Sequence, residues 1–318
     1  MNTKRVVSII LLALVILALA IIPVVIKRDS TVNLVILVLL YMTLASSWNI
    51  LGGYTGQTNL GHAAFFGIGS LTTRLLWIQG LPFGISFLLG GLVAVALALL
   101  IGVPAFKLRG VYFAIGTLAL AQILNLTVSN VLPEMSYNPA ISNYQLIPRY
   151  YLFLALAIIT IGSAYFLVNS KWGMGMMAVR EGEDAAESLG ISALKHKLLA
   201  LVVSAFLAGL VGGAFAFYHV SYYLNMPFSP EWTFDPMMMA YIGGTGTIIG
   251  PMIGSIFFVG LKQLLVWNVG EYHLIIFGTL FILIVLFLPG GLVEAWKKIQ
   301  KLLATRHRRE KKLPASFT

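Results

Sequence analysis

Long apolar runs separated by short polar breaks extend along this chain from residue 6 to residue 288. A helix needs about 20 apolar residues to cross the hydrocarbon core of a membrane, and most of these runs approach that length. The pattern therefore predicts an all-α, polytopic transmembrane helical bundle of about ten spans. The expected spans are Val6–Ile26, Val32–Leu51, Leu60–Ile78, Phe83–Val103, Val111–Asn130, Tyr150–Val168, Leu198–Tyr218, Thr233–Tyr241, Ile248–Trp267 and His273–Leu288.

Several of these spans depart from a uniform apolar run. The third, eighth and ninth are short or interrupted by glycine. Gly67 and Gly69 in the third, and Gly209 and Gly212 in the seventh, give each a face of small residues, which predicts close helix packing. The first run resembles a signal peptide at its start, but it continues through Ile26 and is longer than a signal core. We therefore expect an uncleaved first helix.

The composition agrees with a lipid environment. Hydrophobic residues make up 59% of the 318 residues and charged residues 10%, whereas an ordinary soluble domain is about 45–50% apolar and about 25% charged. Such an excess of apolar surface could not be buried inside a water-soluble protein of this size. The chain has no cysteine, which excludes disulfides, thiolate metal sites and cysteine nucleophiles.

The basic residues are distributed asymmetrically over the expected loops. Ten crossings place both termini on one side, and 16 of the 21 basic residues then lie on that side, including eight in the tail. Short cytoplasmic loops carry such an excess, so we expect both termini to be cytoplasmic. Arg74 and Lys262 lie near outer helix ends, where they are expected to snorkel outward. The expected division is a transmembrane permease domain, 1–292, and a basic cytoplasmic tail, 293–318, that meets membrane lipid and not nucleic acid.

The acidic residues all fall at or outside the ends of the expected spans. Ion-coupled carriers commonly hold a carboxylate within the bilayer, so this mechanism is disfavoured. The histidines have no metal-ligand spacing, and the chain lacks the G-x-x-x-x-G-K-[ST] motif of P-loop ATPases. We therefore expect no enzyme activity and no bound cofactor, and a partner must supply the energy for any uphill transport.

Two glycine-rich stretches interrupt the apolar pattern, one in each half of the chain: 52–62 and 243–251. Irregular backbone at membrane depth needs protein or a water-lined cavity to satisfy its polar groups, and paired breaks point to a translocation pathway. Tight turns with glycine-mediated packing are the alternative interpretation. The candidate pathway residues are Gln57, Thr58, Asn59, His62, Gly243, Gly244, Gly246 and Thr247.

The longest expected cytoplasmic loop, 169–197, is predicted to contain a short helix, 181–190. Negative charge at its start suits the helix dipole, and Gly190 is well placed as the C′ residue that ends it. Ala185, Ala186 and Leu189 are expected to form a small apolar face that suits a socket on another protein. The alternative is a solvated loop helix. The candidate coupling residues are Arg180, Glu181, Glu183, Asp184, Ala185, Ala186, Leu189 and Gly190.

Three motifs, at 53–69, 180–191 and 243–254, together resemble a known family. Asp184-Ala185-Ala186-x-x-x-Gly190 resembles the E-A-A-x-x-x-G loop of ABC importer permeases, with Asp in place of Glu; the I-x-L-P part that follows in that signature is absent. Together with the stretches Gly53-Tyr54-Thr55-Gly56-Gln57 to Gly69 and Gly243-Gly244-x-Gly246-Thr247 to Gly254, it resembles the LivM-type permease of branched-chain amino acid ABC transporters.

The resemblance implies a membrane subunit of an ATP-driven importer. Its implied partners are two cytoplasmic ABC ATPase subunits that hydrolyse the ATP, a sister LivH-type permease and an extracytoplasmic solute-binding protein. The implied location is the inner membrane of a bacterium or archaeon. Relatives with the same motifs carry urea or other small polar solutes, so such a solute stays an alternative, as does a stand-alone channel or facilitator.

Overall fold

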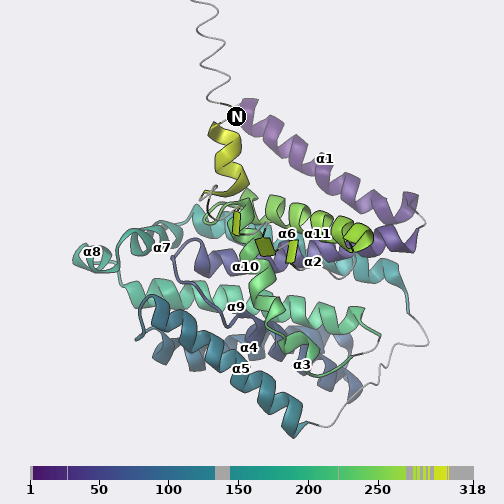
Figure 1. The fold of residues 1–318 in the computed structure, drawn as a ribbon, viewed down its shortest axis with the longest axis horizontal. Coiled ribbons are helices and arrows are strands. Elements are labelled where there is room, and N and C mark those ends of the chain that lie inside the picture. The colour runs from purple at the N-terminus through teal and green to yellow at the C-terminus, as the bar shows by residue number, and fades with distance from the viewer. Residues whose placement is uncertain are drawn as a thin grey trace, which may run out of the picture.

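The chain folds into a bundle of α-helices (Figure 1). The computed structural model describes residues 3–26, 28–132, 144–220 and 222–269, together with parts of 275–300, and these residues contain helices and no strand. The all-α fold is therefore confirmed. The elements are α1 (Thr3–Val25), α2 (Asp29–Gly52), α3 (His62–Ile78), α4 (Phe83–Ala105), α5 (Val111–Val131), α6 (Leu146–Val168), α7 (Lys171–Glu181), α8 (Glu183–Ser188), α9 (Ala193–Tyr218), the 3₁₀ turn η2 (Met226–Phe228), α10 (Glu231–Gly243) and α11 (Ile249–Val269).

Six of the described helices are long and apolar enough to cross a membrane: α2, α4, α5, α6, α9 and residues 249–266 of α11. The expected span His273–Leu288 lies largely outside the described residues, and so does most of the basic tail. Residues 291–298 are helical. The count of ten spans stays a prediction.

Helices α2 and α9 form the centre of the bundle, and most of their residues are buried. Helices α4 and α5 lie outside them and expose rows of leucine and isoleucine, such as Leu92, Leu100 and Ile123. In water such rows would be unfavourable, but a lipid bilayer solvates them. The chain is therefore a multi-pass membrane protein with two central helices.

The predicted small-residue faces of the third and seventh spans meet each other. A Cβ atom at Gly69 of α3 would overlap the backbone of Gly209 in α9, and one at Gly212 would overlap the carbonyl oxygen of Phe66. Only glycine lets the two backbones approach this closely, as in other membrane helix pairs. The expectation of close helix packing is confirmed at this crossing.

Helix α1 is held on α6 by two tyrosines. Pro23 has no N–H, so the carbonyl of Leu19, four residues earlier, loses its helical partner. The Tyr150 hydroxyl donates to that carbonyl at 2.5 Å, and the Tyr151 hydroxyl donates to the carbonyl of Ala20 at 3.0 Å. A backbone group that would otherwise be unsatisfied in lipid is thus paired inside the protein.

Two buried arginines hold the C-terminal end of α9. Arg74 donates to the carbonyl of Ala216 at 3.1 Å, and Arg149 donates to the carbonyl of Phe217 at 2.9 Å. The last carbonyls of a helix lack intrahelical partners and carry partial negative charge, so the two cations are well placed there. The expectation that Arg74 snorkels outward is wrong, because its side chain is fully buried against the Tyr222 ring.

The eighth expected span is not a full crossing. α10 has 13 residues, which is about 20 Å at 1.5 Å per residue and less than the roughly 30 Å hydrocarbon core. Near its start, Trp232 stacks on Phe66 of α3 and on Tyr41, the thirteenth of the 24 residues of α2. Ahead of it, Phe228 fills the space beside Gly67. Helix α10 is therefore a half-helix that begins near the middle of the bundle.

Candidate functional site

The two glycine-rich stretches meet at the side chain of Asn49, in the last turn of α2. Its Oδ1 accepts a hydrogen bond from the Gly246 N–H at 2.8 Å, and its Nδ2 donates to the Thr247 carbonyl at 3.0 Å. Each buried amide bond of this kind contributes about 1 kcal/mol. Burial raises the pKa of the neighbouring Tyr54 hydroxyl to about 12. The two breaks, which lie almost 200 residues apart in the chain, therefore form one structure.

Arg180, at the end of α7, joins the same structure. Its Nη1 donates to the carbonyl of Gly53 at 2.7 Å, which is the short distance typical of a charged donor. A Cβ atom at Gly246 would overlap the Arg180 guanidinium, and Gly246 has a φ of +76°, so glycine is needed there for both reasons. We call the group Asn49, Gly53, Arg180, Gly246 and Thr247 the glycine node. It unites all three motifs that the sequence analysis singled out.

The second glycine-rich stretch also serves helix packing. A Cβ atom at Gly243 would overlap the backbone of Gly250, and one at Gly254 would overlap the carbonyl of Met239. The Thr247 hydroxyl accepts from the Gly250 N–H at 2.9 Å and so satisfies a free donor at the start of α11. These contacts support the alternative interpretation of a tight turn with glycine-mediated packing for this stretch.

The polar residues of the first stretch have separate environments. Gln57 and Thr58 are half-buried. The Asn59 carbonyl accepts from the Trp48 indole at 2.8 Å, and Nε2 of the buried His62 lies 3.0 Å from the Ser47 hydroxyl. A shallow apolar hollow between α3, α4, α5 and α9 borders Asn59 but not the other three residues. The structure does not gather these residues around one cavity, and their pathway role stays a prediction.

The coupling loop forms two helices, α7 and α8, that break at Gly182. The expected C-terminal glycine is confirmed: Gly190 has a φ of +82°. Its N–H donates to the carbonyl of Glu187 at 2.9 Å, and the N–H of Ile191 donates to the carbonyl of Ala186 at 3.0 Å. This pair of bonds is the Schellman motif, which ends the helix sharply and satisfies its last carbonyls. Both helices lie at one end of the bundle, which we call the α8 end (Figure 1).

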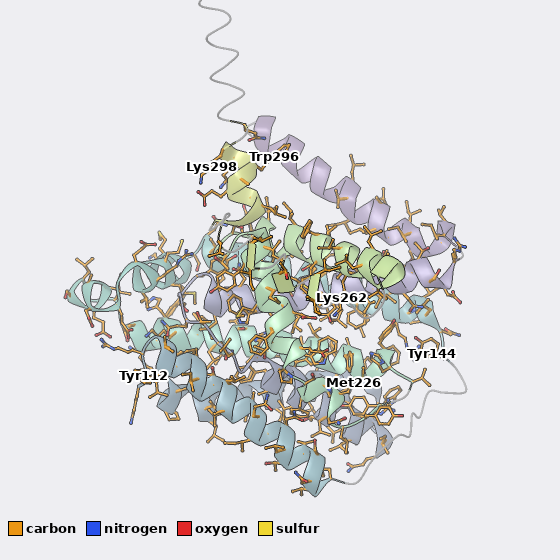
Figure 2. All side chains as sticks on the ribbon, in the orientation of Figure 1. Tyr112, Tyr144, Met226, Lys262, Trp296 and Lys298 are labelled. Carbon is orange, nitrogen blue, oxygen red and sulfur yellow. The ribbon has the colours of Figure 1, made fainter. Side chains whose placement is uncertain are left out.

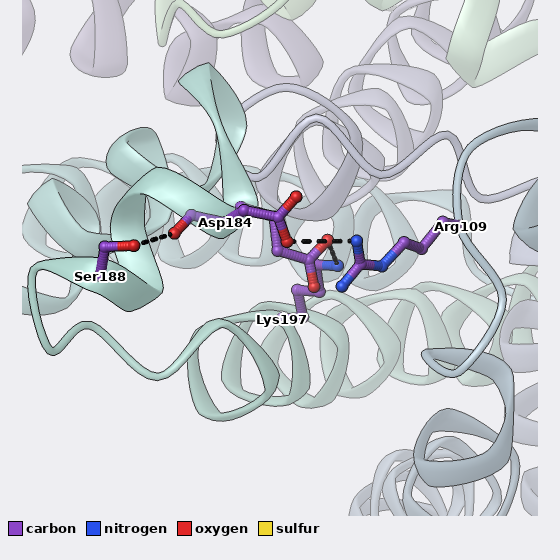
Figure 3. A network of polar contacts seen from close by, with 5 residues as sticks. Arg109, Asp184, Ser188 and Lys197 are labelled. Carbon is purple, nitrogen blue, oxygen red and sulfur yellow. Dashed lines mark hydrogen bonds and ion pairs between the residues drawn. The ribbon is translucent and has the colours of Figure 1, made fainter.

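Two ion pairs tie the start of α8 to the rest of the molecule (Figure 3). Glu183 lies 2.5 Å from Lys197 in the first turns of α9, and Lys197 is only 1% exposed, with its Nζ 5.9 Å from the Phe106 ring. Asp184 lies 3.2 Å from Arg109, in the connection between α4 and α5, and both of these side chains are exposed. Exposed pairs contribute little to stability, whereas a buried charge depends strongly on its partner. The Glu183–Lys197 pair is therefore the stronger of the two ties.

The expected apolar face of α8 is only partly correct. Leu189 is 81% exposed and Ala185 is exposed as well. Ala186 is only 2% exposed, because it packs against Val179 of α7 and Ala193 of α9. The prediction that Ala186 lies on the outward face is wrong, since its methyl group docks α8 on the protein's own helices. A partner at this end would meet Leu189, with Ala185 and the acidic residues around it.

Sequence reasoning missed three residues that build this site. Asn49 is a single polar residue in an apolar run and was not among the candidate residues. A lone amide in such a run is itself a sign that it has a hydrogen-bond partner. Arg109 and Lys197 entered the sequence analysis only among the basic residues that indicate the membrane topology. Their pairing with the acidic residues of α8 depends on where α4 and α9 end, which the hydrophobic pattern does not define. No group of metal-ligating residues is found in the described part of the chain.

Comparison with known proteins gives a consistent family. Residues 30–285 match the family described as "Branched-chain amino acid transport system / permease component". The chain is 28% identical, over 92% of its length and 76% of the relative's, to the "High-affinity branched-chain amino acid transport system permease protein LivM" of Escherichia coli (strain K12). It is 23% identical, over 80% of its length and 90% of the relative's, to the "Probable branched-chain amino acid transport permease protein LivM" of Methanocaldococcus jannaschii.

More distant relatives cover about half of the chain. The "Probable branched-chain amino acid transport permease protein LivH" of Methanocaldococcus jannaschii is 27% identical over 46% of this chain and 49% of its own length. The "Autoinducer 2 import system permease protein LsrC" of Klebsiella pneumoniae is 27% identical over 48% of this chain and 45% of its own. No solved structure matches the chain.

Proposed function

Because the chain belongs to the family of branched-chain amino acid transport permease components, we propose that it is the LivM-type membrane subunit of an ATP-driven importer for branched-chain amino acids. It would act in the inner membrane of a bacterium or archaeon. The α8 end would face the cytoplasm, together with both termini. This orientation is supported by the basic residues Lys107, Arg109, Lys171, Arg180 and Lys195, which come from the helix ends and loops that meet there.

The observation that carries this proposal is the link between α8 and the glycine node. A short helix with an exposed leucine lies at one end of the bundle, and Arg180, three residues before it, bonds to the first glycine-rich stretch. Asn49 connects that stretch to the second. A movement imposed on α8 from the cytoplasm would therefore reach both breaks in the membrane helices through a few short bonds. A channel that opens without a partner has no need of such a link.

The proposed complex contains this chain, a sister LivH-type permease, two ABC ATPases and an extracytoplasmic binding protein. The similarity to a LivH relative over about half of the chain supports a pair of related permeases. In this arrangement Leu189 and Ala185 would enter a socket on an ATPase, and ATP would be hydrolysed by the partner. The binding protein would deliver the solute at the opposite end, where Arg74 and Arg149 hold the end of α9.

The test is reconstitution of the complete complex in liposomes. Uptake of radioactive leucine should require all subunits and ATP, and a complex whose ATPases cannot hydrolyse ATP should be inactive. Uptake by this chain alone, down a gradient and without ATPases, would establish the stand-alone channel instead. Uptake of urea or another small polar solute in place of leucine would keep the importer but change its solute.

The membrane orientation has its own test. Tyr223, in the connection between α9 and α10, is 56% exposed and is a suitable external position. A cysteine at Tyr223 should react with an impermeant reagent added outside intact cells. A cysteine at Ser188 should react only after the cytoplasmic face is opened. The reverse result would invert the proposed topology.

A further inference from the structure

A carboxylate and an amine meet in the middle of the bundle, which the sequence did not predict. Asp235 of α10 lies 3.4 Å from the Lys262 amine of α11, and the Tyr41 hydroxyl of α2 donates to the same carboxylate oxygen at 3.3 Å. The expectation that every acidic residue lies at the end of a span is wrong for Asp235, because α10 is a half-helix. Lys262 was expected to snorkel outward, and it turns to Asp235 instead.

The depth of this pair follows from Tyr41. It is the thirteenth of the 24 residues of α2, which places it about 17–18 Å from either end of that helix. Figure 2 shows Lys262 between the end of the bundle that carries Tyr112 and the end that carries Tyr144. The two charges therefore lie at a depth where a side chain that faced lipid would meet hydrocarbon.

The pair is not sealed from its surroundings. The Lys262 side chain is 38% exposed and that of Asp235 is 14% exposed. Lys262 shares a face of α11 with the buried Ser255, Phe258 and Val259, at spacings of seven, four and three residues. Val266, four residues further along the same face, is 42% exposed, so the protein covers this face only in part. A charged side chain in hydrocarbon at this depth is strongly unfavourable, so the exposure indicates water or polar groups beside it.

Ionisable groups at membrane depth mark solute pathways in transporters, and a discontinuous helix commonly starts beside such a site. The geometry points to a binding site for a zwitterionic solute on its way through the membrane. In this site Asp235 binds the ammonium group of the solute and Lys262 binds its carboxylate. This inference rests on the proposed importer function and adds the residues that meet the solute.

The chemistry favours a zwitterion over a singly charged ion. When the solute enters, each protein charge exchanges its internal partner for the opposite charge of the solute, so no charge is left unpaired. A cation or an anion alone would pair with one residue and leave the other without a counter-charge, which is strongly unfavourable at this depth. The Tyr41 hydroxyl holds the Asp235 carboxylate in place while the exchange occurs. An amino acid with both groups on one carbon fits this requirement.

The experiment uses the natural absence of cysteine in this chain. A Lys262→Cys chain, assembled in the complete importer in liposomes, is treated with a positively charged methanethiosulfonate reagent, which reacts only where water reaches. Ile256→Cys is the matched control, because Ile256 is on the same helix, is 56% exposed and lies on a different face. The thiol of the Lys262→Cys variant should react roughly a hundredfold faster than that of the control.

A lipophilic maleimide, which should label both variants, shows that both thiols are present. If the Lys262→Cys variant reacts with the charged reagent as slowly as the Ile256→Cys control, the site faces lipid or packed protein and the inference is overturned. Such a result with a wild-type complex that takes up leucine would leave the proposed function intact. Failure of the wild-type complex to take up leucine would instead contradict the proposed function itself.

Asp235→Asn tests the same site without relying on the cysteine variants. We expect leucine uptake per ATP hydrolysed to fall at least about tenfold, while binding-protein-stimulated ATP hydrolysis and subunit association stay normal. A merely structural ion pair would lower hydrolysis and association together with uptake. That result, or normal leucine uptake by this variant, would overturn the inference.

Discussion

The crossing of α3 and α9 and the attachment of α8 are held in opposite ways. At the crossing, Gly69 and Gly212 bring backbone against backbone, and nothing between them can rotate away. At the α8 end, a six-residue helix is held by one buried methyl group and by two ion pairs, and the long side chain of Arg180 in the preceding α7 bonds to Gly53. Backbone contact gives a fixed frame, whereas long side chains give a joint that can change its partners. The molecule thus combines a centre held by backbone packing with an end held by side-chain contacts.

The largest expected effect is on the centre held by backbone packing. Gly212→Val would place a branched side chain where the Phe66 carbonyl lies, and the α3–α9 crossing would have to open. Overpacking against backbone should cost at least about 3 kcal/mol. We expect little folded chain in the membrane and a lower melting temperature in detergent. Gly162→Val on α6, where a Cβ atom meets open space, is the matched control and should fold normally. Equal stability of the two variants would contradict the interpretation that backbone packing holds this crossing.

The next effect separates the two sides of α8. Leu189→Asp should leave the chain stable, because Leu189 is exposed, but should weaken ATPase association by roughly a hundredfold. Ala186→Glu should weaken the same association for a different reason, since it forces a charge between α7, α8 and α9 and undocks the helix. Pull-down of the ATPases, with proteolysis of the loop as a second readout, distinguishes them. Glu187→Gln is the control and should behave as wild type. Normal ATPase binding by Leu189→Asp would exclude this helix face as the docking surface.

The smallest expected effect concerns the two ion pairs of α8. Breaking the buried pair should destabilise the docked loop more than breaking the exposed pair. Glu183→Gln leaves the buried Lys197 amine without a counter-charge and should destabilise the docked loop by about 2 kcal/mol. Lys197→Met keeps the apolar stem, removes the buried charge and should cost less. Arg109→Ala removes an exposed pair and should cost under about 1 kcal/mol. Hydrogen exchange of the α8 amides measures all three. The opposite order would mean that the exposed pair, and not the buried one, positions α8.

The sequence predicted the elements better than their contacts. Apolar runs and small-residue spacing were sufficient for α2, α4, α9 and the glycine crossing, because both signals are local. The half-helix α10 has the composition of a short span, and only the packing of Trp232 on Phe66 and Tyr41 shows where it starts. The sequence analysis therefore placed Asp235 at the outer end of a span, whereas the structure places it beside Tyr41, near the middle of α2.

The candidate site shows the same division. The helix end at Gly190 was predictable, because a Schellman motif depends on neighbouring residues. The inward position of Ala186 was not, because it depends on how α7 and α9 pack around α8. The glycine node joins Asn49 to a turn almost 200 residues later and Arg180 to a carbonyl 127 residues earlier. Neither link is encoded in a local pattern.

The Pro23 contact has a consequence for the order in which the chain is built into the membrane. The Leu19 carbonyl that Pro23 leaves free is paired by Tyr150, which is synthesised 131 residues later. Until α6 emerges, α1 carries an unsatisfied polar group that is unfavourable in hydrocarbon by several kcal/mol. We therefore expect α1 to stay beside other protein during insertion until α6 supplies its partner. In that case α1 settles in lipid only together with α6.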